Sequence, residues 1–127
     1  MYPFCQEQAT LLRLRRAADA QGVVRDLYVP EALRRCAFRR ITADGRTAGQ
    51  VYARPICSAV IPADQTPPSL GDMLLPGAHA CDAPLKPAEA AALCRATPCA
   101  FRVTRTEART GAGWPLPHYV AMGESIE

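Results

Sequence analysis

Hydrophobic and polar residues alternate along several short segments of this chain, as they do in β-strands that bury one face. In the segment 101–106, Phe101 and Val103 point to one side of an extended backbone, whereas Arg102 and Thr104 point to the other. Segments of similar length are separated by turn-forming sequences at 20–22, 43–45, 62–72, 76–77 and 110–117. The pattern predicts a mainly β protein of short strands.

A tight hairpin and one helix are also predicted. Residues 36–56 have the pattern of two strands, and Asp44 and Gly45 between them tolerate the positive φ angles of a hairpin turn. Residues 87–96 form the clearest helical segment, because the proline at their start is allowed in a first turn and several alanines follow. By propensity alone the segment 9–17, ATLLRLRRA, also favours a helix.

Charge is distributed unevenly along the 127 residues. The formal net charge is +3, yet residues 1–60 hold ten arginines against five acidic residues, a net charge of +5. Such a basic region can face nucleic acid or an acidic protein partner, and the candidate residues for that contact are Arg34, Arg35, Arg39 and Arg40. A solvated basic surface is the alternative, because the arginines are not interleaved with aromatic residues that stack on bases.

The sequence shows no sign of a membrane span or of a signal peptide. No apolar run approaches the roughly 20 residues that a transmembrane helix needs. The first residues, MYPFCQEQ, lack a basic start and an apolar core. We therefore expect synthesis in a reducing cytoplasm, where disulfides are unlikely to form early, and no membrane partner.

One histidine and three cysteines gather in residues 77–99, namely His79, Cys81, Cys94 and Cys99. Imidazole and thiolate groups are ligands that zinc prefers, but structural zinc sites bring them in close pairs such as C-x₂-C. Here the pairs are H-x-C and C-x₄-C, and an iron–sulfur cluster is disfavoured by the same lack of a C-x₂-C run. We expect no cofactor, and keep a small cysteine-based metal-binding module as an alternative.

Two other roles are open to the cysteines. Cysteine is often buried as a small hydrophobe, and Cys36 and Cys57, each next to apolar residues, fit that role. In an oxidising medium Cys81 could instead form a disulfide with Cys94 or Cys99 and close the segment between them.

No catalytic motif is recognisable. A nucleophilic cysteine needs a nearby histidine, and the only two, His79 and His118, lie outside any known nucleophile motif. H-E-x-x-H, G-x-S-x-G and phosphate-binding glycine loops are absent from the sequence. We predict that the protein is not an enzyme. A nucleic-acid-binding regulator is also disfavoured, because neither a helix-turn-helix pattern nor an aromatic RNA platform occurs.

Several short pieces of sequence follow one another in a distinctive order. The most specific are Gly71-Asp72, followed by an apolar triplet and Gly77, and the closing segment 116–119, LPHY, followed by Gly123. The whole series is ATLLRLRR, VVRDLYVPEALRRCAFRR, SAVIP, LGDMLLPG, AFRVTRTEARTG and LPHYVAMG. Over nearly the whole chain, this series resembles a family of small tailed-bacteriophage structural proteins encoded among head and head–tail connector genes.

The resemblance implies a particular fold. ATLLRLRR becomes a first β-strand in spite of its helical propensity, because tertiary context often overrides that preference. Residues 23–40 become a strand, a turn and a second strand, and residues 78–98 an insertion between strands. We therefore expect a single β domain over residues 1–127, a small antiparallel barrel or sandwich of about six or seven strands with one short helix at 87–96.

The resemblance also implies a function. The chain would be a non-enzymatic virion subunit, a head-completion or head–tail connector protein of the neck that forms a ring between portal and tail. Its partners would be further copies of itself, portal, adaptor or tail proteins, and packaged DNA contacted without sequence specificity. It would be assembled in the cytoplasm of the bacterial host and end in the virion. A tail-tube or tail-terminator subunit is the alternative within the same class, and the resemblance carries over no catalytic residues.

Overall fold

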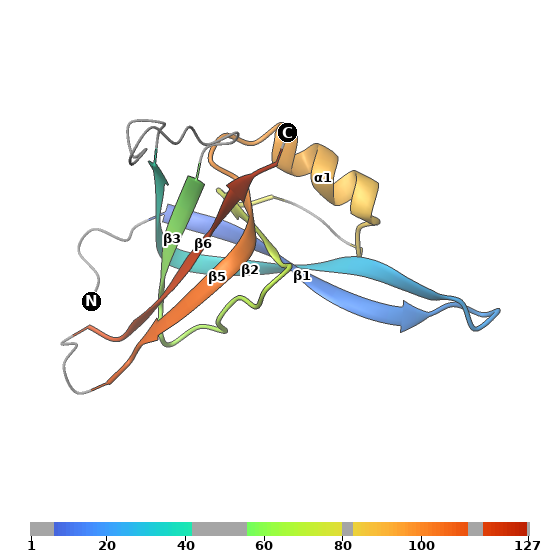
Figure 1. Cartoon of the computed structure of the whole chain (residues 1–127), viewed down its shortest axis with the longest axis horizontal. Helices are drawn as coiled ribbons and strands as arrows, with labels where there is room; N and C mark the ends of the chain where they lie inside the picture. The colour runs from blue at the N-terminus through green and yellow to red at the C-terminus, as the bar shows by residue number, and fades with distance from the viewer. Residues whose placement is uncertain (1–6, 42–55, 80–82, 112–115, 127) are drawn as a thin grey trace, which may run out of the picture.

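Six antiparallel β-strands form a closed barrel in this computed structural model, which describes residues 7–41, 56–79, 83–111 and 116–126 (Figure 1). The elements are β1 (Glu7–Ala18), β2 (Val24–Ile41), β3 (Ile56–Pro62), β4 (Met73–Pro76), α1 (Pro87–Arg95), β5 (Phe101–Arg109) and β6 (His118–Ser125). Around the barrel the strand order is β1-β2-β3-β6-β5-β4. The expected mainly β fold with one short helix is confirmed.

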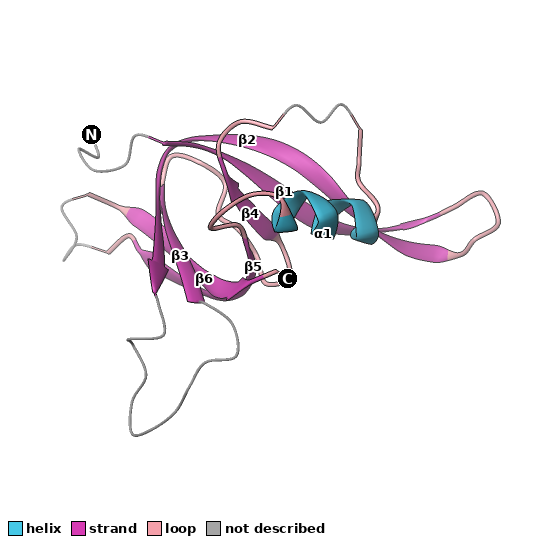
Figure 2. Ribbon diagram, turned by 90° about the horizontal axis from the view of Figure 1, so that it is seen from above, coloured by secondary structure: helices cyan, strands magenta, loops and turns pink. Residues whose placement is uncertain are grey.

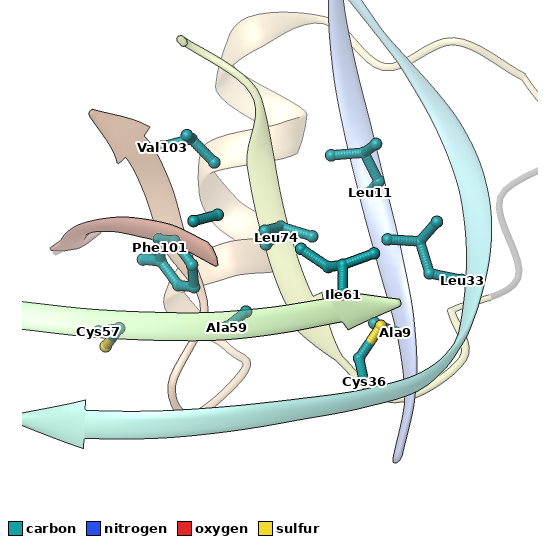
Figure 3. Close-up of a cluster of buried hydrophobic side chains, with 11 residues drawn as sticks. Ala9, Leu11, Leu33, Cys36, Cys57, Ala59, Ile61, Leu74, Phe101 and Val103 are labelled. Atoms are coloured by element: carbon teal, nitrogen blue, oxygen red, sulfur yellow. The ribbon is translucent and has the colours of Figure 1, made fainter. Parts of the chain in front are cut away.

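The inside of the barrel is filled by side chains that alternate along the strands. On β5, Phe101 and Val103 are buried while Arg102 and Thr104 are exposed, as the sequence pattern predicts. The Phe101 ring packs edge to face against Phe38, with the ring centroids 6.3 Å apart. The other members of this inner core are Ala9, Leu11, Leu33, Cys36, Cys57, Ala59, Ile61, Leu74 and Ala121 (Figure 3). The two cysteines are thus buried among hydrophobes, as expected.

A second hydrophobic layer lies outside the barrel, under helix α1 (Figures 1 and 2). Its buried members are Leu12, Tyr28, Met73, Leu75, Ala90, Cys94 and Ala100. The helix begins after Lys86, whose backbone N–H donates to Glu89 Oε1 at 3.0 Å, and ends at Arg95, one residue before the predicted end. The helix belongs to the segment between β4 and β5, where the sequence predicted an insertion, and it packs on residues from β1, β2 and β4.

Strand β1 is buried on both of its faces over residues 9–13. Leu11 points into the barrel and Leu12 points toward α1, and neither side chain is exposed to solvent. A strand between two apolar layers needs hydrophobic residues at consecutive positions, which is why ATLLRLRRA lacks clean alternation. The prediction that this segment is a strand is confirmed against its helical propensity.

The prediction of a strand, a turn and a second strand over residues 23–40 is wrong, because β2 occupies this segment. It is one continuous strand that pairs with β1 as far as Cys36 and with β3 from Ala37 onward. The change of partner occurs at a β-bulge, where the register shifts so that two residues, Arg34 and Arg35, face the single Gln8 of β1. A bulge bends a strand without ending it, so no turn is needed.

Strand β4 lies between two glycines in the left-handed region. Gly71 has φ 91° and Gly77 has φ 89°, angles that residues with a Cβ rarely adopt. The Gly77 N–H donates to the Gln8 carbonyl at 2.7 Å and the Gly71 N–H to the Val103 carbonyl at 2.9 Å. The two glycines of the most specific sequence piece therefore turn the chain into and out of β4 while bonding it to β1 and β5.

Asp72, at the entry to β4, is a buried connecting residue that is only 1% exposed. Its Oδ1 accepts the Leu14 N–H and its Oδ2 the Ser69 N–H, each at 2.8 Å. The same carboxylate lies 3.7 Å from Nη1 of Arg13, a buried arginine that also pairs with Glu31. This carboxylate ties β1 to the turn that leads into β4.

Two sequence predictions cannot be compared with the structure. The hairpin turn at Asp44 and Gly45 lies outside the described residues, although β2 and β3 do pair antiparallel, with Ile41 opposite Ile56. The single-domain assignment for residues 1–127 also stays a prediction.

Candidate functional site

The hairpin of β1 and β2 extends well beyond the barrel and forms a projecting arm, defined here as residues 15–27 (Figures 1 and 2). β4 pairs with β1 only from Ala9 to Leu12, and the first backbone pairing of β2 outside the hairpin is at Tyr28, which bridges to Leu85. Within the described residues, the strands of the arm therefore pair only with each other.

Cross-strand ion pairs and an ordered turn hold the arm together. Arg16 Nε lies 3.2 Å from Asp26 Oδ1, and Arg25 Nε lies 3.2 Å from Asp19 Oδ2. The other oxygen of Asp19 accepts the backbone N–H groups of Gln21 and Val23, each at 2.9 Å. The tip is thus a defined turn, so the arm presents a preformed surface.

The arm exposes both apolar side chains and unpaired strand edges. Val23 and Val24 near the tip are 49% and 63% exposed. The outer edges of β1 and β2 carry backbone N–H and C=O groups that no other strand of the described chain satisfies. Such edges are templates for pairing with another chain, so the arm is a candidate surface for assembly.

Two of the four arginines proposed to face a partner occupy the bulge of β2. The Arg34 N–H donates to Gln65 Oε1 at 2.7 Å, and Gln65 Nε2 donates back to the Arg34 carbonyl. The Gln65 amide thus bonds the bulged backbone as a strand neighbour would. Arg35 has φ 57° and forms an exposed ion pair with Asp64, so its charge already has an acidic partner within the chain.

The other two arginines lie farther along β2. Arg39 is exposed and stands opposite Ser58 of β3, about 13 Å along the strand from Arg35 at the usual rise of about 3.3 Å per residue. The side chain of Arg40 lies outside the described part of the structure. Adjacency in sequence therefore does not place Arg34, Arg35 and Arg39 in one compact basic patch.

Cys94 and Cys99 of the candidate ligand set line one pocket, whereas His79 is not part of its lining. His79 Nε2 lies 3.0 Å from the Pro76 carbonyl, Cys94 is on the buried face of α1, and Cys99 lies half-buried in the turn that follows the helix, with φ 66°. Among the residues that the structure describes, no three His, Cys, Asp or Glu side chains are grouped to hold a metal ion. Cys81 lies outside them, so its pairing with Cys94 or Cys99 stays a prediction.

Cys94 has the environment of an unreactive thiol. It is 2% exposed and its Sγ lies 3.5 Å from Sδ of Met73. Burial raises the pKa of Cys94 to about 12, although Arg102 and Arg95 oppose the shift. The thiolate, which is the nucleophilic form, is therefore scarce at neutral pH.

We expect iodoacetamide to alkylate Cys99 of the folded protein near neutral pH and to leave Cys94 unmodified until the chain unfolds. Peptide mapping by mass spectrometry measures both sites in one sample, and Cys36, also fully buried, is the internal control. Because the folded pKa of Cys94 lies above the unfolded value, its contribution to stability decreases as pH rises from about 9 toward 12. Alkylation of Cys94 at the rate of Cys99 would contradict the buried position.

In the part of the chain that the structure describes, no helix is both long and apolar enough to cross a membrane. Comparisons of the chain with protein-family models, with curated proteins and with solved structures found no match. The projecting arm, the bulge arginines and the sequence pattern are therefore the features on which a functional proposal can be built.

Proposed function

We propose that this chain is a non-enzymatic structural subunit of a tailed-phage or phage-like particle, a head-completion or head–tail connector protein that forms a ring between portal and tail. The observation that carries the proposal is the projecting arm, a two-stranded ribbon with unpaired edges on a closed barrel. The order of the sequence pieces, from ATLLRLRR to LPHYVAMG, supports the phage assignment.

The arm fits assembly between identical copies for a physical reason. An isolated two-stranded hairpin is at best marginally stable in water, and a long exposed edge invites association unless it is protected. An arm that contacts a different surface of the next copy makes a heterologous contact, which closes into a ring when the rotation per subunit divides a full turn. In such a ring Arg34 and Arg39, both exposed, would be available to acidic neighbours or to DNA.

The proposal is tested by measuring whether the purified protein assembles into oligomers. As its concentration is raised, the wild-type protein should form closed oligomers, visible by native mass spectrometry and as rings by negative-stain electron microscopy. Val24→Asp, which places a charge on the exposed apolar tip of the arm, should shift the population toward monomer.

Leu70→Asp is the matched control, because Leu70 is exposed to the same 63% as Val24 but lies on the turn before β4. A wild-type protein that stays monomeric throughout, or two variants that assemble equally well, would contradict assembly through the arm. Open-ended tubes in place of rings would favour the tail-tube alternative, since heterologous contacts that do not close give filaments.

A further inference from the structure

A groove with a volume of about 260 Å³ separates the end of α1 from β5 and β6. Its polar lining consists of Arg95 from the last turn of α1, Arg102 and Thr104 from β5, and Glu124 and Ser125 from β6. We call these five residues the basic groove. It lies outside the arm and outside the arginine segment of β2, and no sequence motif pointed to it.

The two arginines of the basic groove are among the described arginines that lack a carboxylate partner. Five arginines have a carboxylate partner within 4 Å, namely Arg13, Arg16, Arg25, Arg35 and Arg109. Arg95 and Arg102 have no ion pair with any described residue, even though Arg102 stands opposite Glu124 in the β5–β6 ladder. The groove therefore carries two guanidinium groups without an ion pair within 4 Å and one carboxylate, a net charge of +1.

Both guanidinium groups act on the same buried neighbour. Burial is the main cause of the raised pKa of Cys94, and the charges of Arg102 and Arg95 both oppose it. The geometric observation is the lining itself, in which Arg95 of α1 and Arg102 of β5 face one groove.

We propose that the basic groove is a docking site for an acidic side chain of a protein partner. A carboxylate matches the planar fork of a guanidinium group, which can donate two parallel N–H bonds to it. The Ser125 hydroxyl supplies a further polar group in the lining, whereas the Thr104 hydroxyl already donates to the Met122 carbonyl at 3.4 Å. The site stands independently of the arm and of ring formation.

Glu124 favours a single carboxylate over a nucleic acid. DNA brings one negative charge per roughly 1.7 Å of helix axis, so a phosphate between the arginines would bring further phosphates toward the Glu124 carboxylate. A single acidic side chain brings only one negative charge into the groove that Glu124 shares with Arg95 and Arg102. The concave shape of the site also suits a protruding side chain better than a convex duplex.

The test is a titration of the ¹⁵N-labelled protein, followed by NMR, with a short acetylated and amidated peptide that carries a single glutamate among neutral residues. We expect shifts at the backbone amides of the groove, and about tenfold weaker binding when Arg95→Ala and Arg102→Ala are combined, because charge-assisted bonds are lost. Arg95→Lys with Arg102→Lys keeps the charge but not the planar fork, and should restore only part of the affinity.

The matched control combines Lys86→Ala with Arg105→Ala, two exposed basic residues outside the groove, the arm and the β2 arginines, whose removal changes the net charge equally. Thermal melts of all variants check that they are folded. If the control variant bound the peptide as weakly as the double alanine variant of the groove, the loss of affinity would be explained by net charge alone, and the proposal would be overturned. A short DNA duplex that binds the same amides more tightly than the peptide, at the same salt concentration, would overturn it in favour of nucleic acid.

Discussion

Replacing Gly123 with alanine is expected to prevent the barrel from closing. Gly123 lies on β6 between Val103 of β5 and Cys57 of β3. A Cβ at this position would lie 1.7 Å from the Arg102 carbonyl oxygen, and 2.9 Å from Cδ2 of Phe101. The first neighbour is backbone of the adjacent strand, so the overlap can be relieved only by separating β5 from β6. We expect a loss of more than about 3 kcal/mol of folding free energy, at or above the usual range for overpacking.

Gly111→Ala is the control for this substitution. A Cβ at Gly111 would meet no atom within 4 Å, so alanine should change stability by no more than about 1 kcal/mol, through its effect on the unfolded chain. Chemical denaturation followed by circular dichroism measures both variants. A Gly123→Ala protein with the wild-type midpoint would show that β5 and β6 are not paired in the register described above.

The second large effect is expected for Asp72→Asn. The substitution removes the charge that faces buried Arg13, and it leaves one of the two N–H groups of Leu14 and Ser69 facing an amide NH₂. Removing one partner from a buried ion pair costs about 3–5 kcal/mol, because the other charge is left without compensation. Glu31 still pairs with Arg13, so we expect the lower end of that range.

Asp64→Asn is the matched control, since Asp64 pairs with Arg35 at the surface, with side chains 56% and 45% exposed. Exposed pairs contribute about 0–1 kcal/mol, so this variant should unfold close to the wild-type midpoint in urea. Equal midpoints for the two variants would mean that the Asp72 carboxylate does not hold β1 to the turn before β4.

Local patterns in the sequence were sufficient to predict many of the elements. Alternation predicts β5 from Phe101 and Val103, and a proline followed by alanines predicts α1. The glycines at 71 and 77 mark the ends of β4 because their φ angles are positive. In each case the residues that decide the structure are neighbours in the chain.

The bulge in β2 has no such local signal. Arg35 adopts φ 57° without being glycine or asparagine, and the group that stabilises the bulge is the amide of Gln65, which is 31 residues away from Arg34 in sequence. The family resemblance implied a strand, a turn and a second strand here, and no local signal indicates the one bent strand that exists.

The same limit applies to the candidate sites. The sequence drew attention to arginines 34–40 because they are close together, yet the structure pairs Arg35 with Asp64 and leaves Arg95 and Arg102, without an ion pair to any described residue, in a groove between separate elements. Asp72 belongs to one of the most specific sequence pieces, yet its buried connecting role is not visible there, because its partner Leu14 is 58 positions earlier. When a site forms between segments that are distant in the chain, the sequence around each of its residues shows no periodicity or motif spacing that would reveal the site.

The way in which the arm joins the barrel has a mechanical consequence. No loop separates the two, because β1 continues from Leu11 and Leu12, buried in the two hydrophobic layers, directly to Ala18 beside the tip. The Leu14 N–H, bonded to Asp72, fixes the strand where it leaves the barrel wall. The arm is therefore a stiff extension of the barrel wall and not a flap on a flexible loop. A force applied at its tip would be transmitted to β1 and β4.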